Sequence, residues 1–202
     1  MTEIAGVLLA GGLSRRMGGG DKCLRLLRGE TILARVIARA RPQVTSLMLN
    51  ANGDPSRFAD CGLPVVADVV EGYAGPLAGV LTGMVWARER VRNAAWIASF
   101  ACDAPFLPVD LVRQLHRAVA DGGADMACAV SGGQSHPVFG IWPVRLLDDL
   151  RRAILSEGIR KVDAWTARFN LAEVEFQSTR VDPFFNTNRP EDLAEAERLL
   201  AG

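Results

Sequence analysis

Residues 4–22 read IAGVLLAGGLSRRMGGGDK, and this stretch decides the fold class. Its first part, residues 4–10, is a continuous apolar run, which is typical of a strand buried on both faces of a parallel sheet. The part that follows carries five glycines together with Arg15, Arg16 and Lys22. Glycines let backbone N–H groups approach a ligand closely, and the three cations attract an anion. The stretch therefore predicts a buried strand followed by a phosphate-binding loop.

Two common phosphate-binding motifs do not fit this loop. G-x-G-x-x-G is absent, and G-x-x-x-x-G-K-[ST] fails because Asp21 precedes Lys22 and Cys23 follows it. A dehydrogenase and a P-loop NTPase are therefore disfavoured. A surface loop with solvated basic side chains is the alternative, but a position directly after a buried strand favours phosphate binding.

Short apolar runs alternate with helical patterns along the rest of the chain. Further strands are predicted over residues 46–50, 64–67, 95–101, 126–130 and 138–142, and helices over 32–40, 77–91, 109–120, 145–156 and 190–200. This alternation predicts an α/β fold, a three-layer αβα sandwich around a Rossmann-like, mostly parallel sheet. A Ser-Gly-Gly turn at 131–133 predicts a hairpin, and hence one antiparallel edge.

Length and composition favour a single domain over residues 1–202, because 49% of the residues are hydrophobic and 23% are charged. The 23 basic and 23 acidic side chains cancel, which argues against nucleic acid or an anionic membrane as a partner. The longest apolar run is too short to span a membrane. The lack of a secretory or membrane signal favours a cytoplasmic protein, and four cysteines without a C-x-x-C pair indicate reduced thiols.

The glycine-rich loop resembles the L-A-G-G-x-S-R-R-M-G…D-K signature of nucleotidyltransferases with the nucleotide-diphospho-sugar transferase fold, most closely the molybdenum cofactor guanylyltransferases (MobA family). Later segments match that family in order over essentially the whole chain: LNAN at 49–52, Asp68 with GPLAG at 75–79, CDAPFLP at 102–108, His136-Pro137, and NTNRPEDL at 186–193. The resemblance implies transfer of GMP from Mg²⁺–GTP to the phosphate of molybdopterin or its molybdenum-loaded form, with release of pyrophosphate.

The resemblance also implies which residues bind the nucleotide. They are Leu9, Ala10, Gly11, Gly12, Arg15, Lys22, Asn50, Asp68, Gly75 and Asp103. The backbone of residues 9–11 is expected against guanine and ribose, and an acidic side chain such as Asp68 accepts hydrogen bonds from the guanine N1–H and exocyclic amine. For Asn50 the alternative is a turn residue. For Gly75 both a close approach of the backbone and simple turn geometry stay open.

Catalysis is assigned to Lys22, Asp103 and Arg16. A carboxylate directly after an apolar strand is costly to bury unless it is paired or bound to a metal, so Asp103 is the expected Mg²⁺ ligand. The alternative is a helix N-cap just before Pro105. Lys22 is expected to stabilise charge on the triphosphate, with Arg15 and Arg16 neutralising phosphates. Cys102 is not expected to act as a nucleophile, because no histidine lies at a motif-like spacing.

Arg160, Lys161, Asn186 and Asn188 are candidates for binding the pterin substrate, the alternative for the basic pair being solvated charge. Transient contacts with cofactor-inserting proteins or molybdoenzymes are a further expectation. Rival functions are a cytidylyltransferase acting on the same pterin and a sugar-phosphate nucleotidyltransferase, but the Gly11-Gly12 pair favours guanylyl transfer by resemblance. A non-catalytic module that delivers the cofactor is disfavoured by Lys22 and Asp103.

Overall fold

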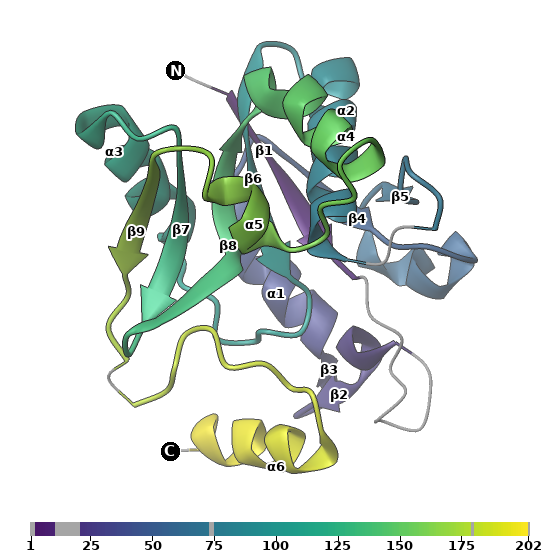
Figure 1. Ribbon diagram of the computed structural model, residues 1–202. Coiled ribbons are helices and arrows are strands. Elements are labelled where there is room, and N and C mark those ends of the chain that lie inside the picture. Colours follow the sequence, from purple (N-terminus) through teal and green to yellow (C-terminus); the bar gives the residue numbers. More distant parts are fainter. Residues whose placement is uncertain (1–2, 11–20, 73–74, 179, 202) are drawn as a thin grey trace.

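The computed structural model describes residues 3–10, 21–72, 75–178 and 180–201. Within these ranges the chain forms a seven-stranded sheet in the order β5-β4-β1-β6-β8-β7-β9 (Figure 1). The strands are β1 (Glu3–Leu9), β4 (Ser46–Asn50), β5 (Val65–Val66), β6 (Ala94–Ala101), β7 (Met126–Ser131), β8 (Gln134–Pro143) and β9 (Leu171–Glu175). A separate small hairpin consists of β2 (Leu26–Leu27) and β3 (Glu30–Thr31).

The sheet is mostly parallel, as predicted. Strands β5, β4, β1 and β6 are mutually parallel, and β7 is parallel to β9. Strand β8 runs antiparallel to both β6 and β7, which confirms the hairpin at 131–133. The predicted position of the reversed strand at an edge is wrong, because β8 lies inside the sheet and β9 covers the far side of β7. The physical reason is the burial of every residue from Phe139 to Pro143, which suits an interior strand.

Helices cover both faces of the sheet (Figure 1). Helices α2 (Pro76–Arg90), α4 (Leu147–Leu155) and α5 (Val162–Thr166) lie on one face, α1 (Ile32–Ala40) and α3 (Leu111–Gly122) on the other, and α6 (Pro190–Leu199) near β2. Short 3₁₀ helices η2 (Lys22–Leu24), η3 (Arg41–Gln43), η4 (Pro55–Cys61) and η5 (Val144–Leu146) connect them. The three-layer prediction is confirmed.

Helix α1 illustrates how local sequence sets an element. The hydroxyl of Thr31 accepts a hydrogen bond from the backbone N–H of Ala34 at 3.1 Å, which caps the helix where the sequence predicts its start. Ile32, Val36 and other apolar residues at helical spacing are buried on one face. The helix therefore covers the sheet with the face that its sequence pattern predicts.

The core consists of two apolar clusters, one on each face of the sheet. Neighbouring residues of a strand enter opposite clusters: Val7 belongs to the cluster with α2 and α4, whereas Leu8 belongs to the cluster with α1 and α3. A strand with two buried faces has to be apolar throughout, and residues 4–10 meet this condition. Among the described residues, no helix has the length and apolar character to cross a membrane.

Candidate functional site

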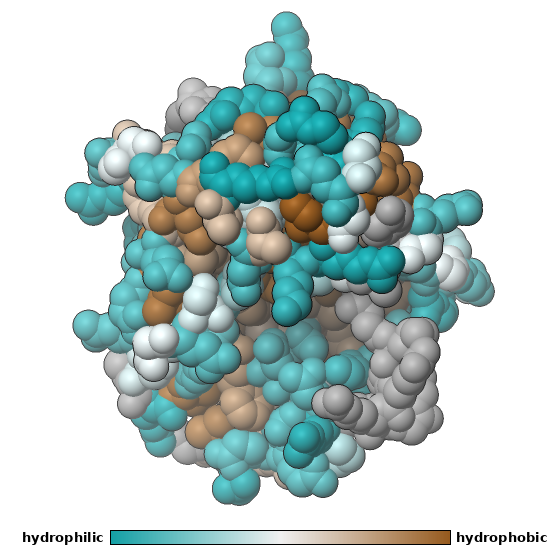
Figure 2. Space-filling view, in the orientation of Figure 1, coloured by the Kyte–Doolittle hydropathy of each residue, from teal (hydrophilic) through white to brown (hydrophobic). Residues whose placement is uncertain are grey.

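The candidate site lies at the carboxyl edge of the parallel strands. Leu9 of β1 is paired with Asn50 of β4 and Ala101 of β6, and Asn50 is paired with Val66 of β5. The four strands therefore end in one row, and the segments that follow them meet at one edge, where ligands bind in open α/β sheets. Figure 2 shows a hollow bordered by hydrophilic side chains on this face of the molecule, above α6.

The structure brings Lys22, Asp103 and Asn188 together from distant parts of the chain. The ammonium Nζ of Lys22 donates a hydrogen bond to Oδ1 of Asn188 at 2.8 Å. Burial raises the pKa of the Asp103 carboxyl, while the charge of Lys22 and a backbone hydrogen bond lower it. Because the effect of burial is the larger, Asp103 lies in surroundings that reward a bound cation.

The turn that carries Asp103 is held by the C-terminal part of the chain. The backbone N–H and the hydroxyl of Thr187 both donate to the carbonyl oxygen of Asp103, at 3.0 and 3.1 Å. Thr187 is buried, so the asparagines on either side of it, Asn186 and Asn188, are fixed beside this turn. The N-cap alternative for Asp103 is wrong, because the next helix begins only at Leu111 after Asp110.

The donor set fits a Mg²⁺ ion that is held mainly by water and phosphate. Asp103 offers a half-buried carboxylate in the turn that follows β6. Throughout the described ranges, no three His, Cys, Asp or Glu side chains are grouped so that they would hold a metal without other ligands. Mg²⁺ commonly uses one or two carboxylates together with substrate phosphates, so a single aspartate is sufficient.

At the neighbouring strands, Asn50, Asn52 and Asp68 form a hydrogen-bonded cluster. The Asp68 carboxylate accepts from Nδ2 of Asn50 at 2.9 Å and from Nδ2 of Asn52 at 2.8 Å, and the Asp68 backbone N–H donates to Oδ1 of Asn52 at 2.8 Å. Each carboxylate oxygen keeps a further lone pair for a ligand. The turn-residue alternative for Asn50 is wrong, because Asn50 ends β4 and is only 4% exposed.

Helix α2 approaches this cluster through glycine. A Cβ on Gly79 would lie 2.5 Å from both Oδ1 of Asn50 and Cδ2 of Leu9, so only glycine leaves room for these side chains. Gly75 precedes the helix with φ +155°, a conformation that suits glycine, and its Cβ position is 3.4 Å from the carbonyl oxygen of Arg160. The start of α2 therefore lies at the same edge as Asn50 and Leu9.

The pterin candidates occupy two positions. The backbone of Arg160 lies against the start of α2, and Lys161 is the exposed residue that precedes α5. Asn186 and Asn188 lie beside Asp103 and Lys22 instead. The side-chain oxygen of Asn186 is buried and accepts no hydrogen bond from the described part of the chain, so its acceptor capacity is unused there.

Four of the predicted residues, Gly11, Gly12, Arg15 and Arg16, lie outside the described residues. The backbone of the two residues before them is engaged in the sheet. The N–H of Ala10 donates to the carbonyl of Asn50 at 2.9 Å, and the carbonyl of Leu9 accepts from Cys102 at 3.4 Å.

Cys102 adjoins Asp103, and its surroundings disfavour the thiolate form. Hydrogen bonding to the Cys23 thiol and burial raise the pKa of Cys102 well above its usual range. Cys102 is buried, and all four cysteines are free thiols. The structure thus agrees with the exclusion of Cys102 as a nucleophile.

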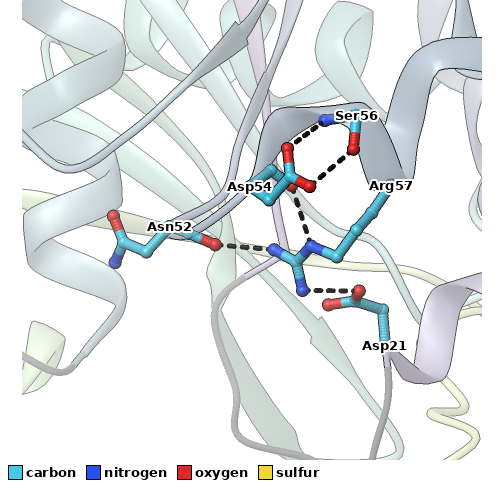
Figure 3. Close-up of polar contacts among 5 residues, drawn as sticks. All are labelled: Asp21, Asn52, Asp54, Ser56 and Arg57. Atoms are coloured by element: carbon cyan, nitrogen blue, oxygen red, sulfur yellow. Dashed lines mark hydrogen bonds and ion pairs between the residues drawn. The ribbon is translucent and has the colours of Figure 1, made fainter.

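Sequence reasoning missed Arg57, whose guanidinium joins its own loop after β4 to Asp21 (Figure 3). It forms an ion pair with Asp21 at 2.7 Å, next to Lys22. Arg57 belongs to none of the motifs that point to the nucleotide. The available signal is the Asn-Gly-Asp-Pro sequence at 52–55, which is typical of a tight turn directly after a strand.

With this geometry established, comparison with known proteins decides the family. A family model for the MobA-like NTP transferase domain matches residues 6–171. The chain belongs to the MobA-like NTP transferase family. This MobA-like transferase is 58% identical over 193 residues to the molybdenum cofactor guanylyltransferase of Rhodopseudomonas palustris. The aligned region covers 96% of this chain and 92% of the relative.

A second relative of this MobA-like transferase, the molybdenum cofactor guanylyltransferase of Nitrobacter hamburgensis, is 56% identical over 97% of this chain and 94% of its own. Among solved structures, the molybdopterin-guanine dinucleotide biosynthesis protein A of Archaeoglobus fulgidus matches with a TM-score of 0.75. That match covers 98% of both chains at 22% identity, and at this identity it supports the nucleotide-diphospho-sugar transferase fold alone.

Proposed function

We propose that this protein transfers GMP from GTP to the terminal phosphate of molybdopterin or its molybdenum-loaded form, producing a dinucleotide cofactor and pyrophosphate. The observation that carries the proposal is the meeting of Lys22, Asp103 and Asn188 at the carboxyl edge. Their arrangement fits charge neutralisation around a triphosphate, and near-full-length similarity to molybdenum cofactor guanylyltransferases supports the choice of substrates.

The reaction needs little help with protons. An oxygen of the acceptor phosphate attacks the α-phosphorus of GTP, a new P–O bond forms, and the bond to the β-phosphate breaks as pyrophosphate leaves with the electron pair. A phosphate monoester has a second pKa of about 6, so this oxygen is largely ionised at neutral pH. Catalysis is then positioning and neutralisation of two polyanions, and no general base is required.

Lys22 is assigned to the negative charge that develops on the transferred and leaving phosphates. Asp103 is the residue that would hold a divalent cation, Mg²⁺ in our proposal, and the cation when bound would neutralise phosphate charge. Asn188 orients the Lys22 ammonium through their 2.8 Å hydrogen bond. Roles for Arg15 and Arg16 in binding phosphates, and for Gly11 and Gly12 beside the nucleotide, stay predictions.

We call the two parts of the site the nucleotide side, which is Leu9, Asn50, Asn52, Asp68 and Gly79, and the acceptor side, which is Arg160, Lys161, Asn186 and Asn188. Asp68 is assigned to the guanine N1–H and amine through its remaining lone pairs. The amide groups of the acceptor-side asparagines suit the amide-like edges of a pterin, and the two basic residues suit its phosphate. Contacts with proteins that receive the product stay a prediction.

The test is a nucleotide panel. The protein is incubated with Mg²⁺, molybdopterin and each of GTP, CTP, ATP and UTP, and pyrophosphate release is measured together with the dinucleotide product. We expect pyrophosphate with GTP only, and only when the pterin is present. Preference for CTP would establish the cytidylyl alternative, and tight pterin binding without pyrophosphate would establish a non-catalytic module.

A further inference from the structure

The Arg57 guanidinium makes three hydrogen bonds next to the site, and its partners lie in three directions (Figure 3). One terminal nitrogen donates to the Asp21 carboxylate at 2.7 Å, and the other donates to the carbonyl of Asn52 at 2.6 Å. The Nε–H donates to the carbonyl of Asp54 at 2.9 Å. The planar guanidinium therefore uses the fixed geometry of its donors, which a lysine ammonium cannot reproduce.

The loop that holds Arg57 is itself fixed. The carboxylate of Asp54 accepts from the backbone N–H of Ser56 at 2.9 Å and from its hydroxyl at 2.6 Å, which caps η4. The guanidinium carbon of Arg57 also lies 5.0 Å from the ring centre of the buried Phe58. Arg57 is thus oriented before any ligand binds, so it is able to impose a position on Asp21.

Two ends of the site meet in this arrangement. Through Asn52, the loop is joined to Asp68 by two hydrogen bonds of 2.8 Å. The loop is also joined to Asp21 by the ion pair of Arg57. Asp21 directly precedes Lys22, and the Lys22 ammonium contacts Asn188. A continuous set of contacts therefore links the nucleotide side to the group assigned to phosphate charge.

We propose that Arg57 is a positioning residue for the transfer reaction: by holding Asp21 it sets the place of Lys22 relative to a nucleotide bound at Asp68. This inference rests on the proposed function. Arg57 touches none of the reacting groups and acts through Asp21, whose side chain is only 16% exposed in the ion pair. Small displacements of a catalytic group are costly, so loss of Arg57 is expected to reduce turnover more than nucleotide binding.

The test compares Arg57→Ala, Arg57→Lys, Asp21→Asn and the double variant Arg57→Ala/Asp21→Asn by steady-state kinetics. We expect kcat to fall roughly 10- to 100-fold in Arg57→Ala, while KM for GTP changes less than about threefold. Asp21→Asn is expected to lower kcat in the same way, and the double variant to be no worse than Arg57→Ala, because both remove one interaction. Arg57→Lys is expected to restore kcat in part.

Arg41→Ala is the matched control. Arg41 donates to the carbonyl of Gly62 at 2.9 Å and so contacts the other end of the same η4 segment without reaching Asp21. We expect its kcat and KM to match those of the wild type. If Arg57→Ala unfolds, Asp21→Asn alone still tests the proposal, because asparagine has the shape of aspartate without its charge.

The outcomes separate this inference from the proposed function. An active wild type with unchanged kcat in Arg57→Ala or Asp21→Asn overturns the positioning role alone. A parallel loss of kcat and melting temperature also overturns it, because a purely structural ion pair would lower both together. Additive effects in the double variant overturn it as well, because they would show that Arg57 and Asp21 act independently. A wild type without GMP transfer overturns the proposed function and this inference with it.

Discussion

On the nucleotide side, Leu9 and Asn50 are aligned by strand register and the Asp68 carboxylate already accepts two side-chain hydrogen bonds. On the acceptor side, Asn186 and Asn188 lie between β9 and α6, where the described residues form no helix or strand, and among the described residues the buried side-chain oxygen of Asn186 has no hydrogen-bond partner. The nucleotide side is therefore organised before it binds, whereas the acceptor side keeps an unsatisfied polar group that only its ligand is expected to satisfy.

The largest effect is expected where the two sides meet. Asp103→Ala and Lys22→Ala are each expected to lower kcat by roughly 10²–10³-fold, because each removes charge stabilisation that both substrates share. Pyrophosphate release under saturating GTP and pterin measures this. Asp121→Asn, an exposed carboxylate on α3 paired with Arg117, is the control and should retain full turnover. Wild-type turnover in either site variant would contradict the shared role.

A smaller effect is expected from filling the gap on the nucleotide side. Gly79→Ala places a methyl group against Asn50 and Leu9 and should destabilise the fold by about 1–3 kcal/mol. GTP affinity should fall about tenfold, equal to about 1.4 kcal/mol, with the acceptor KM unchanged. Calorimetric titration with GTP measures the affinity, and chemical denaturation measures the stability.

Gly122→Ala is the control for that substitution. Nothing lies within 4 Å of a Cβ on Gly122, which is the last residue of α3. Alanine is the better helix former by up to about 1 kcal/mol, so this variant should be at least as stable as the wild type. Equal losses in both variants would show that the packing around Asn50 is not the cause.

On the acceptor side, Asn186→Ala should separate binding from folding. Removal of an unsatisfied buried oxygen relieves a cost of about 1–3 kcal/mol, so the free energy of unfolding should stay constant or rise. The KM for the pterin should rise about tenfold, and the KM for GTP should not change. Asn170→Ala, which removes an exposed amide bonded to Gly123, is the control and should leave both KM values unchanged. A large loss of stability in Asn186→Ala would indicate a structural role.

The smallest effect concerns stability against pH. Burial raises the pKa of Asp103 in the folded protein, so the folded chain binds this proton more tightly than the unfolded chain. The wild type therefore loses stability as pH rises from the ordinary aspartate pKa of about 3.9 through the higher folded pKa. Asp103→Asn should be more stable than the wild type at neutral pH without metal or nucleotide, and the gain should vanish below about pH 4. A gain that is largest in acid would contradict this sign.

The sequence was sufficient for the features that depend on local pattern. The apolar run at 4–10, the cap at Thr31 and the hairpin at 131–133 were all predicted and are present, because periodicity, capping and turn chemistry act within a few residues. Contacts between distant segments were not predictable in this way. The interior place of β8 and the presence of β9 depend on pairing across the sheet.

The same distinction applies to the site. Motif order pointed to Lys22, Asp103 and Asn188, and these residues meet in the structure. The role of Arg57 in holding Asp21 has no motif, because an ion pair between residues 36 apart leaves no period or spacing in the sequence. Nor did any pattern indicate that the Asn186 oxygen is buried and accepts no hydrogen bond from the residues that the structure describes.

The two hydrogen bonds from Thr187 to the carbonyl of Asp103 have a consequence for synthesis on the ribosome. Thr187 follows Asp103 by 84 residues, so every strand of the sheet is translated before these two hydrogen bonds can form. Nascent chains grow at about 5–20 residues per second, and the earlier elements have time to assemble first. A polypeptide that stalled after β9 would contain every strand of the sheet but lack the asparagines beside Asp103, so transferase activity should emerge late in translation and abruptly.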